Sequence, residues 1–247
     1  MRQLIKRTIN RLLRPAHLEL RGINAPRLED PFWVQTRIIR HPHPVIFDVG
    51  AHEGEICELY LHLFPGCSLH AFEPGPDAHQ KLQSRLKNNP SVRLNQTAVS
   101  DVEGTVAMNF NSSTATSSLL ASDPRAAEAW GTGLLDTQSV GQVPSTTLDA
   151  YCRSAKIEAI DILKLDIQGA ELKALYGASG LLESRRVGLV YMEIILTPTY
   201  RGQPSLEDYL RFFHGVGYDL LDFYHPVHKD LSLIQSDMIL VPRPQEP

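Results

Sequence analysis

The stretch Val45-Ile-Phe-Asp-Val-Gly-Ala-His-Glu-Gly54 decides the fold. It opens with an apolar run that carries one acid, Asp48, and this composition is typical of a buried β-strand. The residues that follow include Gly50 and Gly54, and a helical pattern begins directly after them. Glycine lets the backbone pass close to a ligand, and the start of a helix presents free N–H donors. The stretch therefore predicts a strand, a ligand-binding turn and a helix in direct succession.

Apolar runs of the same kind alternate with helical patterns from His43 onward. Such alternation indicates βαβ units around a mostly parallel sheet, with right-handed crossovers that place helices on both faces. We expect an α/β, Rossmann-like fold whose seven-stranded sheet is completed by an antiparallel edge strand. The expected strands cover residues 45–51, 68–73, 92–98, 160–166, 187–193, 218–224 and 237–241, and the expected helices cover residues 54–64, 76–88, 170–176 and 205–214.

The sequence predicts a single folded domain over residues 43–247, preceded by a basic helical extension over residues 1–42. Residues 104–145 interrupt the alternation of strands and helices. They begin with a strand expected at 105–110 and continue with six Ser or Thr among residues 111–118. Long segments of this kind inside a domain are often functional lids, so we expect an inserted hairpin that acts as a lid.

The charge distribution argues against nucleic acid as a partner. The 247-residue chain has a net charge of −4, although residues 1–27 alone carry seven Lys or Arg against one acid, so the rest of the chain is acidic. Nucleic acid binds to basic surfaces. The basic start also fits an amphipathic helix that lies on an anionic membrane, and the alternative is a helix that packs on the body or frays.

The cysteine count favours a reducing compartment. Cys57, Cys67 and Cys152 have no metal-ligand spacing, and any disulfide scheme leaves one thiol unpaired. No apolar stretch approaches the length of a transmembrane helix, and residues 1–20 lack the features of a secretory signal. We therefore expect a cytoplasmic protein.

The turn after the first expected strand differs from a dinucleotide-binding turn. Ligands of open α/β sheets bind beyond the carboxyl ends of the strands, so the residues there carry most weight. A dinucleotide-binding turn has the pattern G-x-G-x-x-G, whereas this turn has His52 in place of the second glycine and acids at Asp48 and Glu53. These acids would repel a pyrophosphate and attract a cationic ligand. A tight turn that binds nothing is the alternative.

Glu73 ends the second expected strand, 23 residues beyond Gly50. A carboxylate at this point accepts hydrogen bonds from both ribose hydroxyls in nucleoside-binding βαβ folds. The alternative is a solvated glutamate at the end of a strand. Because the glycine turn and the acid occur together at the right separation, the pair predicts a ligand that contains a nucleoside.

Four segments carry a resemblance to a known family: Phe47-Asp-Val-Gly-Ala51, Ala71-Phe-Glu-Pro74, Thr146-Thr-Leu-Asp149 and Leu163-Lys-Leu-Asp-Ile-Gln-Gly-Ala-Glu171. Together they resemble the FkbM-type methyltransferases, over residues 44–217. The resemblance implies the class I methyltransferase fold, S-adenosylmethionine as the methyl donor, and an acceptor oxygen on a sugar or a secondary metabolite. The chain departs from the family at His52, where the family commonly has Asn.

The resemblance also implies which residues form the donor site, with residues 98–101 near the adenine. From the residues alone, 98–101 are only the end of a strand followed by a turn. The expected donor-binding residues are Asp48, Gly50, Ala51, His52, Gly54, Glu73, Pro74, Ala98, Val99, Ser100, Asp101 and Asp166.

Methyl transfer to a hydroxyl needs an aligned acceptor and a group that takes the proton. The candidate catalytic residues are Asp166, Glu193 and His52, and we expect Asp166 to act as the base or to orient the acceptor, assisted by Glu193. Alternatively, Asp166 and Glu171 mark a helix entry where acids favour the helix dipole. A divalent metal on Asp166 and Glu193 is a further alternative, but two carboxylates do not identify a metal site and none is expected.

The acceptor is expected to be a small molecule or a saccharide, bound between the Ser/Thr-rich segment and residues 197–203. Two other functions fit the same scaffold: methylation of a nitrogen or of a protein side chain, and donor binding without turnover. The sequence names neither the acceptor nor the oligomeric state, because acceptor specificity resides in variable loops.

Overall fold

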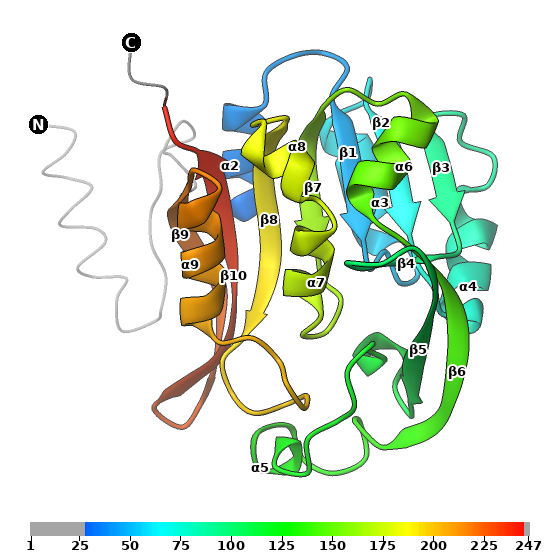
Figure 1. The fold of residues 1–247 in the computed structure, drawn as a ribbon, viewed down its shortest axis with the longest axis vertical. Helices are drawn as coiled ribbons and strands as arrows, with labels where there is room; N and C mark the ends of the chain where they lie inside the picture. Colours follow the sequence, from blue (N-terminus) through cyan, green and yellow to red (C-terminus); the bar gives the residue numbers. More distant parts are fainter. Residues whose placement is uncertain (1–27, 245–247) are drawn as a thin grey trace, which may run out of the picture.

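A seven-stranded sheet forms the centre of the computed structural model, which describes residues 28–244 (Figure 1). Its strand order is β3-β2-β1-β7-β8-β10-β9. The first five of these strands pair in parallel, so their carboxyl ends meet at one edge of the sheet. The strands are β1 (Val45–Val49), β2 (Ser68–Phe72), β3 (Val92–Asn95), β7 (Ile160–Leu165), β8 (Val187–Ile195), β9 (Tyr218–Lys229) and β10 (Ser232–Pro242).

The predicted α/β fold with a mostly parallel sheet is confirmed. Its antiparallel part is the hairpin of β9 and β10, in which β10 pairs antiparallel with both β8 and β9. The last strand of the sheet in chain order therefore lies one position inside the edge, and β9 forms the edge itself.

Helices cover both faces of the sheet, as the crossover rule predicts. One face packs against α6 (Leu148–Ala155), α7 (Glu171–Tyr176), α8 (Ser179–Glu183) and α9 (Leu206–Gly215) through a core that includes Leu148, Leu175, Leu182 and Phe213. The other face packs against α2 (Pro31–Ile38), α3 (Glu55–Leu63) and α4 (Pro76–Leu86) through Val34, Tyr60 and Leu82. Figure 1 shows the first group of helices in front of the sheet.

Helix α2 lies within the segment expected as an N-terminal extension, yet it packs on the sheet. Asp30 caps it by accepting hydrogen bonds from the amides of Phe32 and Trp33. Gln35 is fully buried, and its Oε1 accepts a hydrogen bond of 3.0 Å from the hydroxyl of Tyr60 in α3. At least this part of the extension contributes to the core.

The region between β3 and β7 folds into a second, three-stranded sheet of order β4-β6-β5. The strand expected at 92–98 is wrong in extent: β3 ends at Asn95, and β4 (Ala98–Val99) pairs with β6 (Thr137–Thr146) instead. Strand β6 pairs antiparallel with β5 (Gly104–Asn111) and forms the expected hairpin. The turn helix η2 (Thr114–Thr116) and helix α5 (Ala126–Trp130) lie between the two strands of this hairpin.

Strand β6 and the helices α5, α6 and α8 were not predicted from the sequence. The residues of β6 are mostly polar and exposed on both faces, so they carry no alternating apolar pattern. Helix α6 follows Thr147, whose side chain caps it by accepting a hydrogen bond from the amide of Ala150. Because β6 is polar, the sequence did not predict the second strand of the hairpin.

No helix within residues 28–244 is long and apolar enough to cross a membrane. The hypothesis of a membrane-surface helix concerns residues 1–20, which lie outside the described residues. All three cysteines are buried and unpaired. The cytoplasmic location remains a prediction.

Candidate active site

A cavity of about 280 Å³ lies at the carboxyl ends of β1, β2 and β7. The hairpin of β5 and β6, called the lid hairpin below, and the residues between its strands lie over it. Its wall combines the turn after β1, the end of β2, residues 97–99, residues from 108 to 119 and the loop after β7. These segments are far apart in the chain, and the parallel sheet brings their ends together. The cavity therefore lies where the sequence predicts the ligand site.

The turn after β1 is shaped by Gly50. Its φ is 79°, and a Cβ on it would lie 1.8 Å from the carbonyl oxygen of Asp166, so no other residue fits without a backbone shift. The amides of Gly50 and Ala51 both donate hydrogen bonds of 3.0 Å to the carbonyl of Phe72 at the end of β2. The glycine thus allows the ends of β1, β2 and β7 to meet around one cavity.

Glu73 stands in the cavity wall with its carboxylate held in place. Its Oε2 accepts a hydrogen bond of 3.0 Å from the amide of His52, and its Oε1 accepts one of 2.8 Å from the amide of Gly75. Burial raises the pKa of Glu73, while these two amide hydrogen bonds act in the opposite direction. Each oxygen has a further lone pair, so the carboxylate can accept hydrogen bonds from a ligand.

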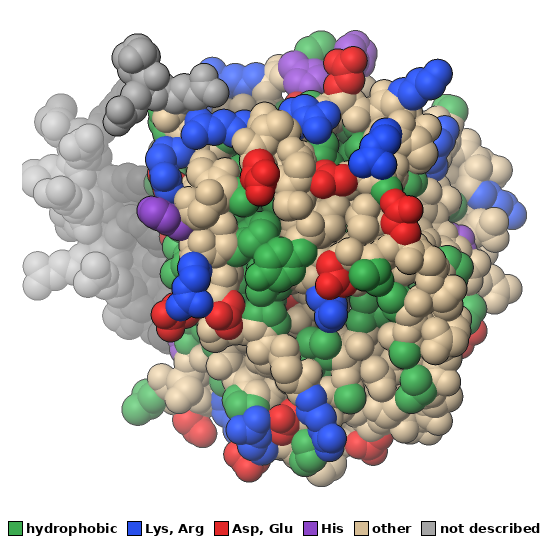
Figure 2. All heavy atoms as spheres, in the orientation of Figure 1, with side chains coloured by type: hydrophobic (Ala, Val, Ile, Leu, Met, Phe, Trp, Pro, Cys, Tyr) green, Lys and Arg blue, Asp and Glu red, His purple; other side chains and the backbone are tan. Residues whose placement is uncertain are grey.

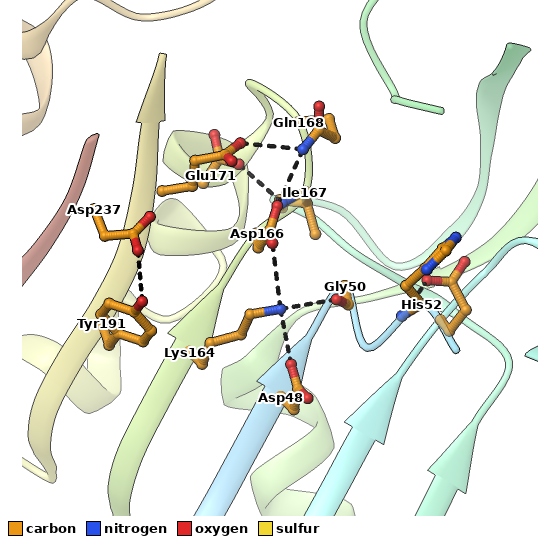
Figure 3. A network of polar contacts seen from close by, with 12 residues as sticks. Asp48, Gly50, His52, Lys164, Asp166, Ile167, Gln168, Glu171, Tyr191 and Asp237 are labelled. Carbon is orange, nitrogen blue, oxygen red and sulfur yellow. Dashed lines mark hydrogen bonds and ion pairs between the residues drawn. The ribbon is translucent and has the colours of Figure 1, made fainter. Parts of the chain in front are cut away.

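Lys164 lies behind the glycine turn and is almost fully buried. Its Nζ donates to the carbonyl of Gly50 at 2.8 Å and lies 2.9 Å from Asp48 Oδ1 and 3.7 Å from Asp166 Oδ2 (Figure 3). Burial alone would lower the pKa of Lys164, but the charges of Asp48 and Asp166 outweigh it and raise the pKa above its ordinary value. Lys164 therefore links β1, its turn and the end of β7 as a buried cation.

Asp48 faces the core rather than the cavity. It has no exposed surface, pairs with Lys164 and accepts a hydrogen bond of 3.2 Å from the Cys57 thiol. Its role in the structure is to hold Lys164, one layer behind the cavity wall.

Gln168 organises the loop after β7, where its φ of 59° is unusual for a residue other than glycine. Its Nε2 donates to Asp166 Oδ1 and to Glu193 Oε2, both at 3.1 Å. Its Oε1 accepts a hydrogen bond of 2.9 Å from the hydroxyl of Tyr200. Because every polar atom of the amide is engaged, the orientation of Gln168 is fixed.

Two glutamates support this loop from outside the cavity. Glu171 Oε1 accepts hydrogen bonds from the amides of Ile167 and Gly169, at 2.9 and 3.2 Å, and its Oε2 accepts one of 3.1 Å from Tyr209. Glu193 holds Gln168 on one side, and its Oε1 accepts a hydrogen bond of 2.6 Å from Gln235. Burial raises the pKa of both glutamates, and the charge of Asp166 adds to this shift.

His52 connects the turn to the lid. Its Nε2 lies 2.9 Å from the Thr114 hydroxyl, and its ring belongs to the cavity wall. The residue has a φ of 46°, so the turn is tight at this position. The side chain of His52 therefore bridges the turn after β1 and η2.

The structure brings together most of the residues that the sequence singled out. Those that line the cavity are Gly50, Ala51, His52, Glu73, Pro74, Ala98, Val99 and Asp166. Those that do not line it are Asp48, Gly54, Ser100, Asp101 and Glu193. Gly54 is the N-cap residue of α3, and Ser100 is buried and donates a hydrogen bond of 2.9 Å to the exposed Asp101.

Sequence reasoning missed Lys164 and Gln168 as members of this cavity wall. A lysine inside an otherwise apolar strand is a signal that was available, because buried lysines need a charged partner. Gln168 carries no such signal, because its contacts depend on the loop conformation. In the described part of the chain, no group of three or more His, Cys, Asp or Glu is placed to hold a metal ion.

Comparisons with known proteins give a consistent result. Residues 48–220 match a family model described as the methyltransferase FkbM domain. The chain is 28% identical to the 2-O-methyltransferase NoeI of Sinorhizobium fredii, over 74% of this chain and 81% of that protein. It is 41% identical to the 31-O-demethyl-FK506 methyltransferase FkbM of Streptomyces tacrolimicus, over 28% of this chain and 27% of that protein. It is 26% identical to the hexuronic acid methyltransferase AglP of Haloferax volcanii, over 61% of this chain and 55% of that protein.

Proposed function

The chain belongs to the FkbM methyltransferase family, and on this premise we propose that it transfers the methyl group of S-adenosylmethionine to a hydroxyl of a saccharide or related metabolite. The observation that carries the proposal is the position of Glu73. Its fixed carboxylate shares one cavity with the Gly50 turn and with Asp166. The cavity therefore contains a hydrogen-bond acceptor for a ribose, Glu73, and a second acid, Asp166, near the proposed site of methyl transfer.

The residues present fit S-adenosylmethionine. Glu73 would accept hydrogen bonds from the ribose hydroxyls, and the apolar side chains of Val99, Met108 and Leu119 would pack against the adenine. The carboxylate of Asp166 favours a cationic ligand, since opposite charges attract strongly where water is excluded. S-adenosylmethionine, when bound, supplies a methyl group on a positively charged sulfur.

Asp166 is the carboxylate best placed to take the proton of the acceptor hydroxyl. Its side chain is 39% exposed and lines the cavity, whereas Asp48 is fully buried behind it. Gln168 fixes the orientation of Asp166 through the 3.1 Å hydrogen bond to Oδ1, and Glu193 fixes Gln168. We assign Asp166 as the general base, with Gln168 and Glu193 as positioning residues.

An oxygen acceptor is supported by the relatives. One is named a 2-O-methyltransferase, one acts on a 31-O-demethyl compound, and one is a hexuronic acid methyltransferase. Of these, the 2-O-methyltransferase matches over the largest share of this chain. The assay described next also tests the two alternatives, methylation of a nitrogen or a protein and donor binding without turnover.

The test measures methyl transfer from labelled S-adenosylmethionine to a panel of glycosides, small alcohols, amines and peptides. We expect transfer to a glycoside or alcohol, and Asp166→Asn should lower kcat by at least about 100-fold, the lower end of general-base effects. Asp230→Asn, in the exposed turn between β9 and β10, is the matched control and should behave as wild type. Absence of donor binding in calorimetry, or transfer only to nitrogen, would overturn the proposal.

A further inference from the structure

A second cavity of about 200 Å³ adjoins the donor cavity. Ala115 and Gln168 line both cavities, so the two meet at the tip of η2 and the loop after β7. The second cavity lies between the lid hairpin and the region where β8 ends and β10 begins. Besides the two shared residues, its wall includes Trp130, Leu134, Leu135, Ile195, Tyr200 and Gln235.

One side of this cavity is apolar and rigid. Trp130 is held by a hydrogen bond of 2.7 Å from its Nε1 to the Thr199 hydroxyl. Tyr200 is only 2% exposed, and its hydroxyl lies 2.8 Å from the carbonyl of Thr116 and 2.9 Å from Gln168 Oε1. Aromatic side chains fixed in this way offer a flat apolar surface to a ring.

Another part of the cavity wall is polar and is backed by the acids Asp166 and Glu193. The amide of Gln168 bridges Asp166 and Glu193, and the amide of Gln235 donates to Glu193 at 2.6 Å. Among the described residues, no Lys, Arg or His lines this cavity. Asp166 and Glu193 therefore lie one hydrogen bond away from the cavity. The cation that pairs with Asp166 is the buried Lys164, 3.7 Å from Asp166 Oδ2, and it does not line the cavity. Bringing an anionic ligand into this environment is unfavourable.

We propose that this second cavity is the acceptor subsite and that it selects an uncharged hydroxylated ring, such as a neutral pyranoside, over a uronate. The proposal rests on the proposed function, because it places the acceptor hydroxyl at the junction where Asp166 and Gln168 meet the donor cavity. The apolar face of the ring packs on Trp130 and Leu135, and the hydroxyl-bearing edge faces the amide groups. The acceptor expected here thus differs in charge from a hexuronic acid, the compound named for one relative.

The test uses a matched pair of probes, methyl glucoside and methyl glucuronide, which differ only in the carboxylate at C6. Trp33 and Trp130 are the only tryptophans of the chain, so Trp33→Phe leaves Trp130 as a single fluorescent reporter in the cavity. Each probe is titrated into this variant of the full-length protein, saturated with S-adenosylhomocysteine. We expect the glucoside to change the emission of Trp130 and to bind at least about tenfold more tightly than the glucuronide.

Two variants and one control test how the cavity recognises the ring and the charge of the acceptor. Trp130→Ala should weaken glucoside binding about tenfold or more in calorimetry and leave S-adenosylhomocysteine affinity unchanged, whereas Leu231→Ala, at a fully exposed position, should change neither. Gln235→Lys introduces a cation at the polar edge and should raise glucuronide affinity about tenfold.

The outcomes separate the two proposals. Equal or tighter binding of the glucuronide, no binding of the glucoside, or an unchanged glucoside affinity in Trp130→Ala overturns the acceptor subsite. Failure of the wild-type protein to bind S-adenosylhomocysteine in calorimetry instead overturns the methyl-transfer function on which it rests.

Discussion

At the scale of single residues, the proposed donor site depends on Glu73. Its carboxylate is oriented by two backbone amides before any ligand arrives, so a ligand does not have to order it. Charge-assisted hydrogen bonds contribute about 1.5–3 kcal/mol each. We therefore expect Glu73→Ala to weaken affinity for S-adenosylhomocysteine by roughly ten- to hundredfold. Calorimetry measures the affinity, with the exposed Glu103→Ala as control, and an unchanged affinity would contradict the assignment.

His70 makes stability depend on pH. Burial, reinforced by the charge of Arg93, lowers its pKa from 6.5 to about 4. The unfolded chain binds this proton near its ordinary pKa and the folded chain does not, so the free energy of unfolding falls as the pH drops from about 6.5 toward about 4. At about pH 4.5 the loss should be roughly 2–3 kcal/mol.

Urea unfolding at about pH 7 and about pH 4.5 checks this prediction. The His70→Gln variant should lose less stability on acidification than the wild type. The exposed His228→Gln serves as control and should lose as much as the wild type. Equal losses in wild type and His70→Gln would show that another group controls the loss of stability at acidic pH.

At the residue scale, the sequence predicts that Gly50 and Glu73 share one site, and both line the same cavity. The pairing of β1 with β2, which α3 connects, places the ends of the two strands side by side. Asp48 was expected in the donor site but points into the core, because side chains alternate along a strand and only the fold decides which face holds the ligand. Lys164 was not predicted because it lies within β7 and not in the residues that follow the strand.

At the scale of elements, the strand–turn–helix of β1 and α3 depends on the close approach of Gly50 to β7. Gly50→Ala places a Cβ 1.8 Å from the Asp166 carbonyl oxygen, and that oxygen belongs to the backbone. Gly202→Ala has a similar φ of 74° but nothing within 4 Å, so it carries only the left-handed backbone cost.

We expect Gly50→Ala to lower the free energy of unfolding by at least about 2 kcal/mol more than Gly202→Ala does. It should also abolish measurable donor binding, because the shifted turn no longer presents the His52 amide to Glu73. Denaturant unfolding and calorimetry on both variants measure these effects. Equal destabilisation by the two substitutions would mean that the turn relaxes around the new Cβ.

Most elements of the core were predicted, with α6 and α8 as exceptions, whereas of the two hairpin strands β5 and β6 only β5 was predicted. Helices α3, α4, α7 and α9 lie within two residues of their expected ends, because each packs an apolar stripe on the sheet. Strand β6 was not predicted because its residues are mostly polar and exposed, and backbone pairing with β4 and β5 holds it without an apolar pattern.

At the scale of the whole molecule, the cavity joins the sheet edge to the lid. The Gly50 turn and residues 114–119 line the same space, and His52 touches Thr114. Donor binding should therefore slow amide hydrogen exchange in residues 50–54 and 114–119 together. Exchange mass spectrometry with and without S-adenosylhomocysteine tests this, with the β9–β10 turn as an unaffected reference. Protection confined to the turn would show that the lid does not close on the donor.

The surface offers no single dominant charge on the face drawn in Figure 2, where Lys and Arg are interspersed with Asp and Glu. The expectation of no nucleic-acid partner stays a prediction, as do the small-molecule or saccharide acceptor and the domain boundary at residue 43.

The insertion of β10 between β8 and β9 has a consequence for biosynthesis. The outer edge of β8, from Val190 to Ile195, finds its partner only when residues 235–240 have left the ribosome. Until then, a nascent chain that has already formed the parallel strands exposes an open hydrogen-bonding edge of apolar residues. Such edges invite pairing with other chains, so the partly folded protein is prone to aggregate until β10 pairs with β8.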